Sequence, residues 1–123
     1  MLKVGPAQRV IIHLNDDIGS RDDYLHNQIL TLLYEREVAG ATVIQPHAGF
    51  GLHHRLHTRG APKPEGEHLP VRIEFVEDRQ KVEVLLPELF ELLTDGMIEI
   101  QETNVVRVAG KLFAHRSQSG PNG

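Results

Sequence analysis

Apolar and polar positions along the chain follow two different periods, and together they predict an alternation of strands and helices. Short β-branched runs bounded by polar turn residues predict strands at 9–14, 41–45 and 70–76, and a last strand in two pieces at 97–101 and 105–108, interrupted by 102–104. The run at 70–76 alternates most clearly, because Val71, Ile73 and Phe75 fall on one side of it. This run therefore predicts a strand with one buried face.

The segment between the first two strands has the spacing of a helix. Ser20, with Asp23 three residues later, is a variant of the capping box that starts many helices. Gly40 is the expected stop. One face is marked at 3.6-residue spacing by Leu25, Ile29, Leu32, Leu33 and Arg36.

A second helix is predicted after Asp78, which is placed to cap it, and Asp95-Gly96 is expected to end it. Pro87 lies inside this helix, where proline removes a backbone hydrogen bond at a cost of about 3 kcal/mol. We therefore expect a kink or a break at Pro87. The apolar stripe of this helix consists of Val82, Leu85, Leu86, Leu89, Leu92 and Leu93.

The order β-α-β-loop-β-α-β is that of a ferredoxin-like α+β fold, with an antiparallel four-stranded sheet and two helices on one face. Residues 1–123 are expected to form a single domain with a core at about 8–109 and a C-terminal tail, 110–123, that is polar except for Leu112 and Phe113. Two helices cover only one face of such a sheet. The apolar content of the strands favours burial of the other face against further copies of the chain.

Composition narrows the class of function. The chain has no cysteine, which leaves no disulfide or thiolate chemistry, and no apolar run long enough for a membrane helix or signal peptide, so we expect a cytoplasmic protein. A formal net charge of −4 argues against nucleic acid as a partner.

The long segment 46–68 between two strands is the strongest functional signal, because long loops in small domains usually carry function. Gly49 and Gly51 flank Phe50, which lets the backbone turn tightly and approach a ligand. Residues 53–63 then combine Arg55, Arg59 and Lys63 with three histidines and no acid. A local basic loop on an acidic body suits a small anion.

The three loop histidines, His53, His54 and His57, raise the alternative of a metal site. His53 and His57 have the i,i+4 spacing that suits zinc or copper on a helix, but the segment has little helical character and no cysteine completes a site. A solvated, histidine-rich loop is the favoured interpretation, with the three histidines as the metal candidates. His13 is expected to be a packed or hydrogen-bonded core histidine.

The acids near the first helix, Asp16, Asp17, Asp22 and Asp23, are explained by capping and by the helix dipole. No acid–base pair, Ser-His-Asp order or phosphate-binding lysine loop accompanies them. We therefore do not expect an enzyme.

An ordered set of motifs resembles the PII-like family of domain of unknown function 190 (DUF190). In chain order the motifs are Ala39-Gly40-Ala41-Thr42-Val43, Gly49-Phe50-Gly51, Arg55-Leu56-His57-Thr58, Leu69-Pro70-Val71-Arg72-Ile73-Glu74-Phe75-Val76 and Leu86-Pro87-Glu88-Leu89. The resemblance covers roughly residues 8–109, and it accounts for Pro87 as part of a family motif.

The resemblance implies a homotrimer that binds an adenine nucleotide (ATP, ADP or AMP) in clefts between subunits, with no required cofactor. Leu52 and His53 stand where PII proteins have an arginine–glutamine pair, so Arg55 is expected to supply the replacement charge. Arg107, late in the last strand, is the expected basic residue facing the phosphates. The expected nucleotide-binding residues are Gly49, Phe50, Gly51, Leu52, Arg55, His57 and Arg107.

The function implied by the resemblance is that of a PII-like signalling protein whose loop at 46–68 reports the bound nucleotide to a transporter, channel or enzyme. The alternative is a CutA-like trimer for metal binding or metal tolerance that uses the histidine loop.

Overall fold

The computed structural model describes residues 2–14, 24–45, 48–49, 57–58 and 71–110. Its elements, in chain order, are β1 (Gly5–Leu14), α1 (Leu25–Glu35), β2 (Thr42–Ile44), β3 (Ala48–Gly49), β4 (His57–Thr58), β5 (Val71–Glu77), α2 (Arg79–Leu92) and β6 (Gly96–Val105). Among the described residues, no helix has the length and apolar character needed to span a bilayer.

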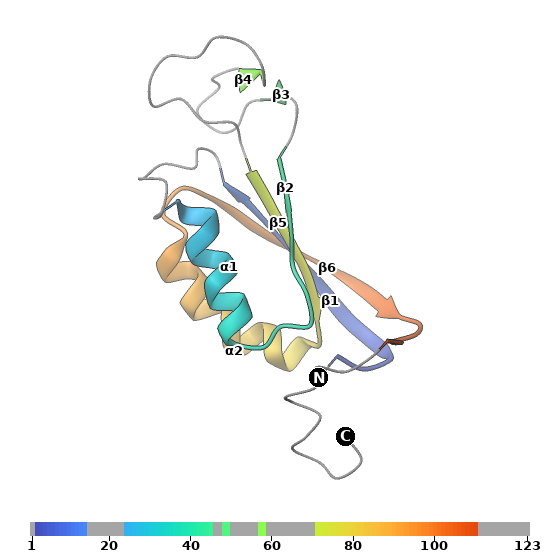
Figure 1. The fold of residues 1–123 in the computed structure, drawn as a ribbon. Coiled ribbons are helices and arrows are strands. Elements are labelled where there is room, and N and C mark those ends of the chain that lie inside the picture. The colour runs from blue at the N-terminus through green and yellow to red at the C-terminus, as the bar shows by residue number, and fades with distance from the viewer. Residues whose placement is uncertain (1, 15–23, 46–47, 50–56, 59–70, 111–123) are drawn as a thin grey trace.

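Four of the strands form one antiparallel sheet in the order β2-β5-β1-β6, and both helices lie on one of its faces (Figure 1). This arrangement confirms the predicted ferredoxin-like α+β fold. β3 and β4 form a separate two-stranded ladder beyond the end of the sheet where β2 ends and β5 begins (Figure 1).

The core lies between the sheet and the two helices. The strands contribute alternating side chains, and the helices contribute residues at helical spacing. Its buried members are Val10, Ile12, Leu14, Leu25, Ile29, Leu33, Val71, Ile73, Phe75, Val82, Leu85 and Leu89. Full burial of side chains of this size stabilises a fold by about 1.5–3 kcal/mol each. The periodic patterns at 70–76 and in both helices are thereby confirmed.

Helix α1 ends earlier than the sequence pattern predicts. The last helical residue is Glu35, and Glu37 takes a left-handed conformation with φ 61°. The Val38 N–H donates to the Leu33 carbonyl (3.1 Å) and the Glu37 N–H donates to the Tyr34 carbonyl (3.0 Å), the two bonds of a Schellman motif. The prediction that Gly40 stops the helix is therefore wrong, because the hydrogen-bonded cap closes three residues earlier.

The predicted start of α1 at Ser20 and Asp23, and the acids Asp16, Asp17 and Asp22, lie outside the described residues. The structure places the N-cap at Tyr24, without a hydrogen bond from its side chain to the helix backbone.

Helix α2 begins as predicted, with the Asp78 side chain accepting a hydrogen bond from the Lys81 N–H at 2.9 Å. The helix then continues without interruption through Pro87, so of the two predicted alternatives the break is wrong and the kink stays a prediction. Pro87 and Glu83, whose carbonyl loses its helical donor, both lie on the exposed side of the helix. An unpaired carbonyl on the exposed side of a helix can be hydrated, so its lost hydrogen bond does not break the helix.

Strand β6 is a single strand of ten residues, which corrects the prediction of two pieces. Glu102, Thr103 and Asn104, read as an interruption, pair in register with Gln8, Ala7 and Pro6. The strand continues because β1 begins at Gly5, four residues before the predicted start, and so provides a backbone partner. The Gln8 side-chain amide also donates to the Glu102 carboxylate at 2.9 Å.

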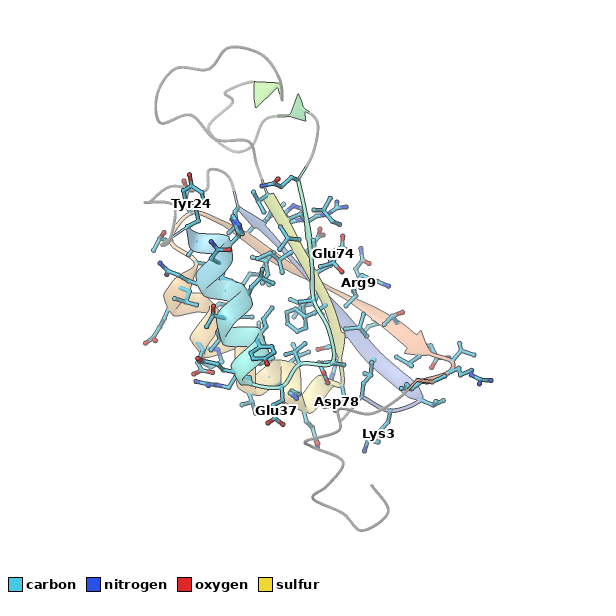
Figure 2. All side chains as sticks on the ribbon, viewed as in Figure 1. Lys3, Arg9, Tyr24, Glu37, Glu74 and Asp78 are labelled. Carbon is cyan, nitrogen blue, oxygen red and sulfur yellow. The ribbon has the colours of Figure 1, made fainter. Side chains whose placement is uncertain are left out.

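The face of the sheet away from the helices is charged. Figure 2 shows Arg9 and Glu74 on this side, where the Arg9 guanidinium lies 3.6 Å from the Glu74 carboxylate. Arg72 also pairs with Glu74 at 2.9 Å, and His13 Nε2 lies 2.8 Å from Glu99 Oε1. His13 is therefore hydrogen-bonded, as one of the two predicted alternatives had it, but it is half-buried on the open face and is not in the core.

Candidate functional site

The β3–β4 ladder brings together two of the residues expected to bind nucleotide. Gly49 and His57 pair directly across it, as do Ala48 and Thr58. The other expected loop residues, Phe50, Gly51, Leu52 and Arg55, and the metal candidates His53 and His54, lie outside the described residues. The base of the predicted loop is thus a short antiparallel ladder with a glycine facing a histidine.

Strands β2 and β5 position this ladder at one end of the sheet. Ile44, the last residue of β2, pairs with Arg72 near the start of β5. Arg72 in turn pairs with His13, and Val71 pairs with Leu14, near the end of β1. The two strands that hold the ladder are therefore fixed by backbone pairing to the central strand of the sheet.

Gly96 lies at this same end, where β6 starts and pairs with Leu14. Its φ is +155°, and a Cβ built on it would lie 2.0 Å from the His13 carbonyl oxygen. Two backbone segments meet there with no room for a side chain. In the sequence, Asp95-Gly96 predicts only a helix end, and this dipeptide is the one signal for the close approach.

The basic groups that the structure describes next to the ladder are already paired. Arg72 shares Glu74 with Arg9, and His13 faces Glu99, so positive and negative groups alternate over the open face. A bound phosphate would have to compete with Glu74 for Arg72. The free positive charge expected for anion binding therefore has to come from the segment that carries Arg55 or from another copy of the chain.

The resemblance placed Arg107 late in the last strand, but the structure places it outside that strand. Strand β6 ends at Val105, and Arg107 is exposed two residues beyond it. The residue at which β6 ends lies at the opposite end of the sheet from β3 and β4 (Figure 1). Because a ten-residue strand spans about 34 Å, Arg107 of one chain does not meet Gly49 and His57 of the same chain.

The described groups with a shifted pKa, Arg36 and Glu88, lie elsewhere, at the two helices. The Arg36 guanidinium forms a two-pronged pair with the Glu88 carboxylate, and its Nε donates to Oε1 at 3.0 Å. This hydrogen bond lowers the pKa of Glu88 and raises that of Arg36. The pair joins α1 to α2 and is an ordinary structural ion pair.

Within the described ranges, no three histidine, cysteine, aspartate or glutamate side chains come together in a way that could hold a metal ion. Of the loop histidines, only His57 falls in these ranges, and only its backbone pairing is described. The metal alternative therefore rests on His53 and His54, which are outside the description.

Comparison with known proteins gives a family match over most of the chain. The model of family DUF190, described as "Uncharacterized ACR", matches residues 7–105.

Solved structures of one PII-like protein share the fold. The chain is similar to CPII, a nitrogen regulatory PII-like protein from Thiomonas intermedia K12, bound to ADP, AMP and bicarbonate, with a TM-score of 0.57 and 22% identity over 87% of this chain and 94% of that chain. CPII bound to ADP and bicarbonate gives a TM-score of 0.54 at 19% identity, covering 87% of this chain and 95% of that chain. The apo form gives 0.52 at 18% identity, covering 88% and 100%. At these identities the likeness establishes the fold.

Proposed function

The chain belongs to the DUF190 family, and from that premise we propose that it is a PII-like regulatory protein that binds an adenine nucleotide. The observation that carries the proposal is the pairing of Gly49 with His57 at the end of a PII-like sheet. This pairing places Gly49, the first residue of the glycine-aromatic-glycine motif, at the base of the loop. In the proposed site, backbone N–H groups and basic side chains meet phosphate there. CPII, a protein of the same fold, has been crystallised with ADP and AMP.

We infer that the complete site forms between copies of the chain. Arg107 and the Gly49–His57 pair occupy opposite ends of one sheet, so a site that uses both needs two chains. A homotrimer with its open sheet faces turned inward satisfies this requirement and covers Ile44 and Met97 on that face. Light scattering at micromolar protein should return the mass of a trimer, and a monomer mass would refute the assembly.

The regulatory output in this proposal is the loop at 46–68. Nucleotide binding orders or releases the loop, and a transporter, channel or enzyme reads its state, a known form of switching. The protein itself acts without catalysing a reaction, and the cytoplasmic location expected from the sequence stays a prediction.

Nucleotide binding is tested by calorimetry and thermal shift with ATP, ADP, AMP and cyclic AMP. A bound nucleotide raises the melting temperature by mass action. Gly51→Val should abolish the effect, because the branched side chain occupies the place where the backbone meets phosphate. Gly40→Ala is the matched control, since nothing lies within 4 Å of a Cβ at Gly40. No shift with any adenine nucleotide at millimolar concentration would refute the proposal.

The contribution of two chains to one site is tested by mixing variants. Arg55→Ala and Arg107→Ala should each lose a charge-assisted hydrogen bond worth about 1.5–3 kcal/mol, or about ten- to a hundredfold in affinity. In trimers assembled from both variants, some interfaces combine an intact Arg55 with an intact Arg107. Those interfaces should regain the affinity of the unmodified protein. Mixed trimers that bind as weakly as the single variants would show that the two arginines do not share a site.

The same titrations are repeated with zinc and copper to test the metal-binding alternative. Changing His53, His54 and His57 together to alanine should leave folding and assembly intact. A tight stoichiometric metal site that disappears in this triple variant would instead favour the CutA-like alternative.

A further inference from the structure

The outer surface of α2, away from the sheet, has an unusual composition for a solvent-exposed helix face. Val84, Pro87 and Phe90 follow one another at i, i+3 and i+6 and are exposed, Val84 by 70% and Phe90 by 62%. Residues three apart on a helix are surface neighbours, so these three form one continuous apolar ridge.

Two carboxylates flank this ridge. Glu83 and Glu91 are each four residues from Pro87, so the row Glu83–Pro87–Glu91 crosses the apolar row at Pro87. Glu88, by contrast, is occupied by Arg36. Among the described residues, Glu83 and Glu91 have no ion-pair or hydrogen-bond partner, so both are available to a cationic ligand.

We propose that this face of α2 is the docking site of the chain's own C-terminal segment, Lys111 to Arg116. That segment lies outside the described residues and has the complementary chemistry: Lys111, Leu112, Phe113, Ala114, His115 and Arg116 combine basic groups with two large apolar side chains. This inference is independent of nucleotide binding.

The spacing of the two partners agrees. Along α2, Glu83 and Glu91 are about 12 Å apart at 1.5 Å per residue. In an extended segment, Lys111 and His115 are about 13 Å apart and share one side with Phe113 between them. Lys111 and His115 then face the two carboxylates while Phe113 covers the ridge at Pro87.

The chain is long enough to reach this site. The Arg79 guanidinium at the start of α2 lies 3.8 Å from the Glu102 carboxylate on β6, which places the two elements side by side there. From Glu102 the strand runs about 10 Å further to Val105, and Pro87 lies about 12 Å along α2 from Arg79. Residues 106–113 span up to about 26–29 Å, which covers the return and the distance along the helix.

Because the chain contains no tryptophan, one introduced tryptophan reports docking directly in the full-length protein. Phe113→Trp should show blue-shifted emission and several-fold weaker quenching by acrylamide than Asn122→Trp, the matched control near the chain end. Reversing the charges with Glu83→Lys and Glu91→Lys should shift the Phe113→Trp emission to the red and raise its quenching to the control level. Both glutamates are exposed and outside the core, so these changes leave the fold intact.

Three results would overturn the proposal. The first is a Phe113→Trp side chain as accessible as the Asn122→Trp control. The second is a protected side chain whose emission does not respond to charge reversal on α2. The third is a fall in oligomer mass on changing Val84→Asp and Phe90→Ser, measured by light scattering, because it would assign the ridge to a second copy of the chain.

Discussion

The two faces of the sheet are built from neighbouring residues of the same strands, yet different forces hold them. On the face covered by the helices, Val10, Ile12, Ile73 and Phe75 are buried among other apolar side chains. On the open face, Arg9 and Arg72 pair with Glu74, and the apolar side chain of Ile11 lies among these charged groups. Burial on the covered face therefore stabilises a single chain on its own. The charged side chains of the open face can be solvated by water or can pair with further copies of the chain.

This contrast changes the physical picture of the proposed assembly. The apolar content of the strands predicted burial of the uncovered face, but most apolar strand residues face the helices. Ion pairs that are half-exposed contribute only about 0–1 kcal/mol each to stability. An interface built on the open face is therefore expected to rely on matching of charge as much as on apolar burial.

The largest expected effect is at the end of the covered face where β6 begins. Gly96→Ala forces a Cβ to within 2.0 Å of the His13 carbonyl oxygen, at a φ that L-residues rarely adopt. We expect a loss of more than about 4 kcal/mol in the free energy of unfolding, measured by urea denaturation. Gly40→Ala should be close to neutral, and a similar loss in that control would mean that glycine content, not this contact, sets the effect.

Adjacent residues of β5 test the two faces directly. Ile73→Ala on the covered face should cost about 2–5 kcal/mol, because the residue is fully buried. Glu74→Ala on the open face should cost about 0–1 kcal/mol, since it removes surface ion pairs only. Both are measured by urea denaturation at equal protein concentration, which keeps any assembly effect constant. Equal losses would mean that the open face is buried in the native assembly.

The Arg36–Glu88 pair gives a pH-dependent effect of smaller size. The hydrogen bond from Arg36 lowers the pKa of Glu88 in the folded state, so its stabilisation is complete above the ordinary glutamate range. The stabilisation is lost as the pH falls through the lowered pKa. Glu88→Gln should therefore be less stable than the unmodified protein near neutral pH, and the two should converge in acid. A stability difference that stays constant with pH would show that the pair is not responsible.

The smallest effect is expected at the cap of α1. Glu37 holds a left-handed conformation that glycine adopts without strain, so Glu37→Gly should raise the free energy of unfolding by about 0.5–1 kcal/mol. Glu37→Ala is the control, because it removes the same side chain and keeps the strain. If glycine and alanine have the same effect, the backbone conformation at residue 37 is not what limits the cap.

The sequence was sufficient to predict the fold because buried apolar residues recur with the period of the strand or helix that carries them. The period of two at Val71, Ile73 and Phe75 and the helical spacing from Val82 to Leu89 identify their elements without any knowledge of partners. The Asp78 cap was predictable for the same reason, since its hydrogen bond closes within three residues.

Features that depend on distant partners could not be predicted in this way. Glu102 to Asn104 look like a turn, and only their pairing with Pro6 to Gln8 keeps them in a strand. The early end of α1 depends on a backbone motif at Glu37, a residue type with no preference for it. In the candidate site, the assignment of Gly49 and His57 to nucleotide binding stays a prediction, and nothing in the sequence indicated that the two residues pair. Arg107 was predicted in a strand that ends before it.

The pairing of the first strand with the last also sets the order in which the molecule can fold. β1 lies between β5 and β6, and the Gln8–Glu102 contact joins residues 94 positions apart. During synthesis β1 leaves the ribosome first, but its partner on one side arrives only after both helices and the long loop have been made. Contacts of such long range slow folding, because closing the long intervening loop costs chain entropy before the contact contributes to stability. Until then the edge of β1 is an unpaired strand, and chaperone binding at this stage would protect it from other nascent chains.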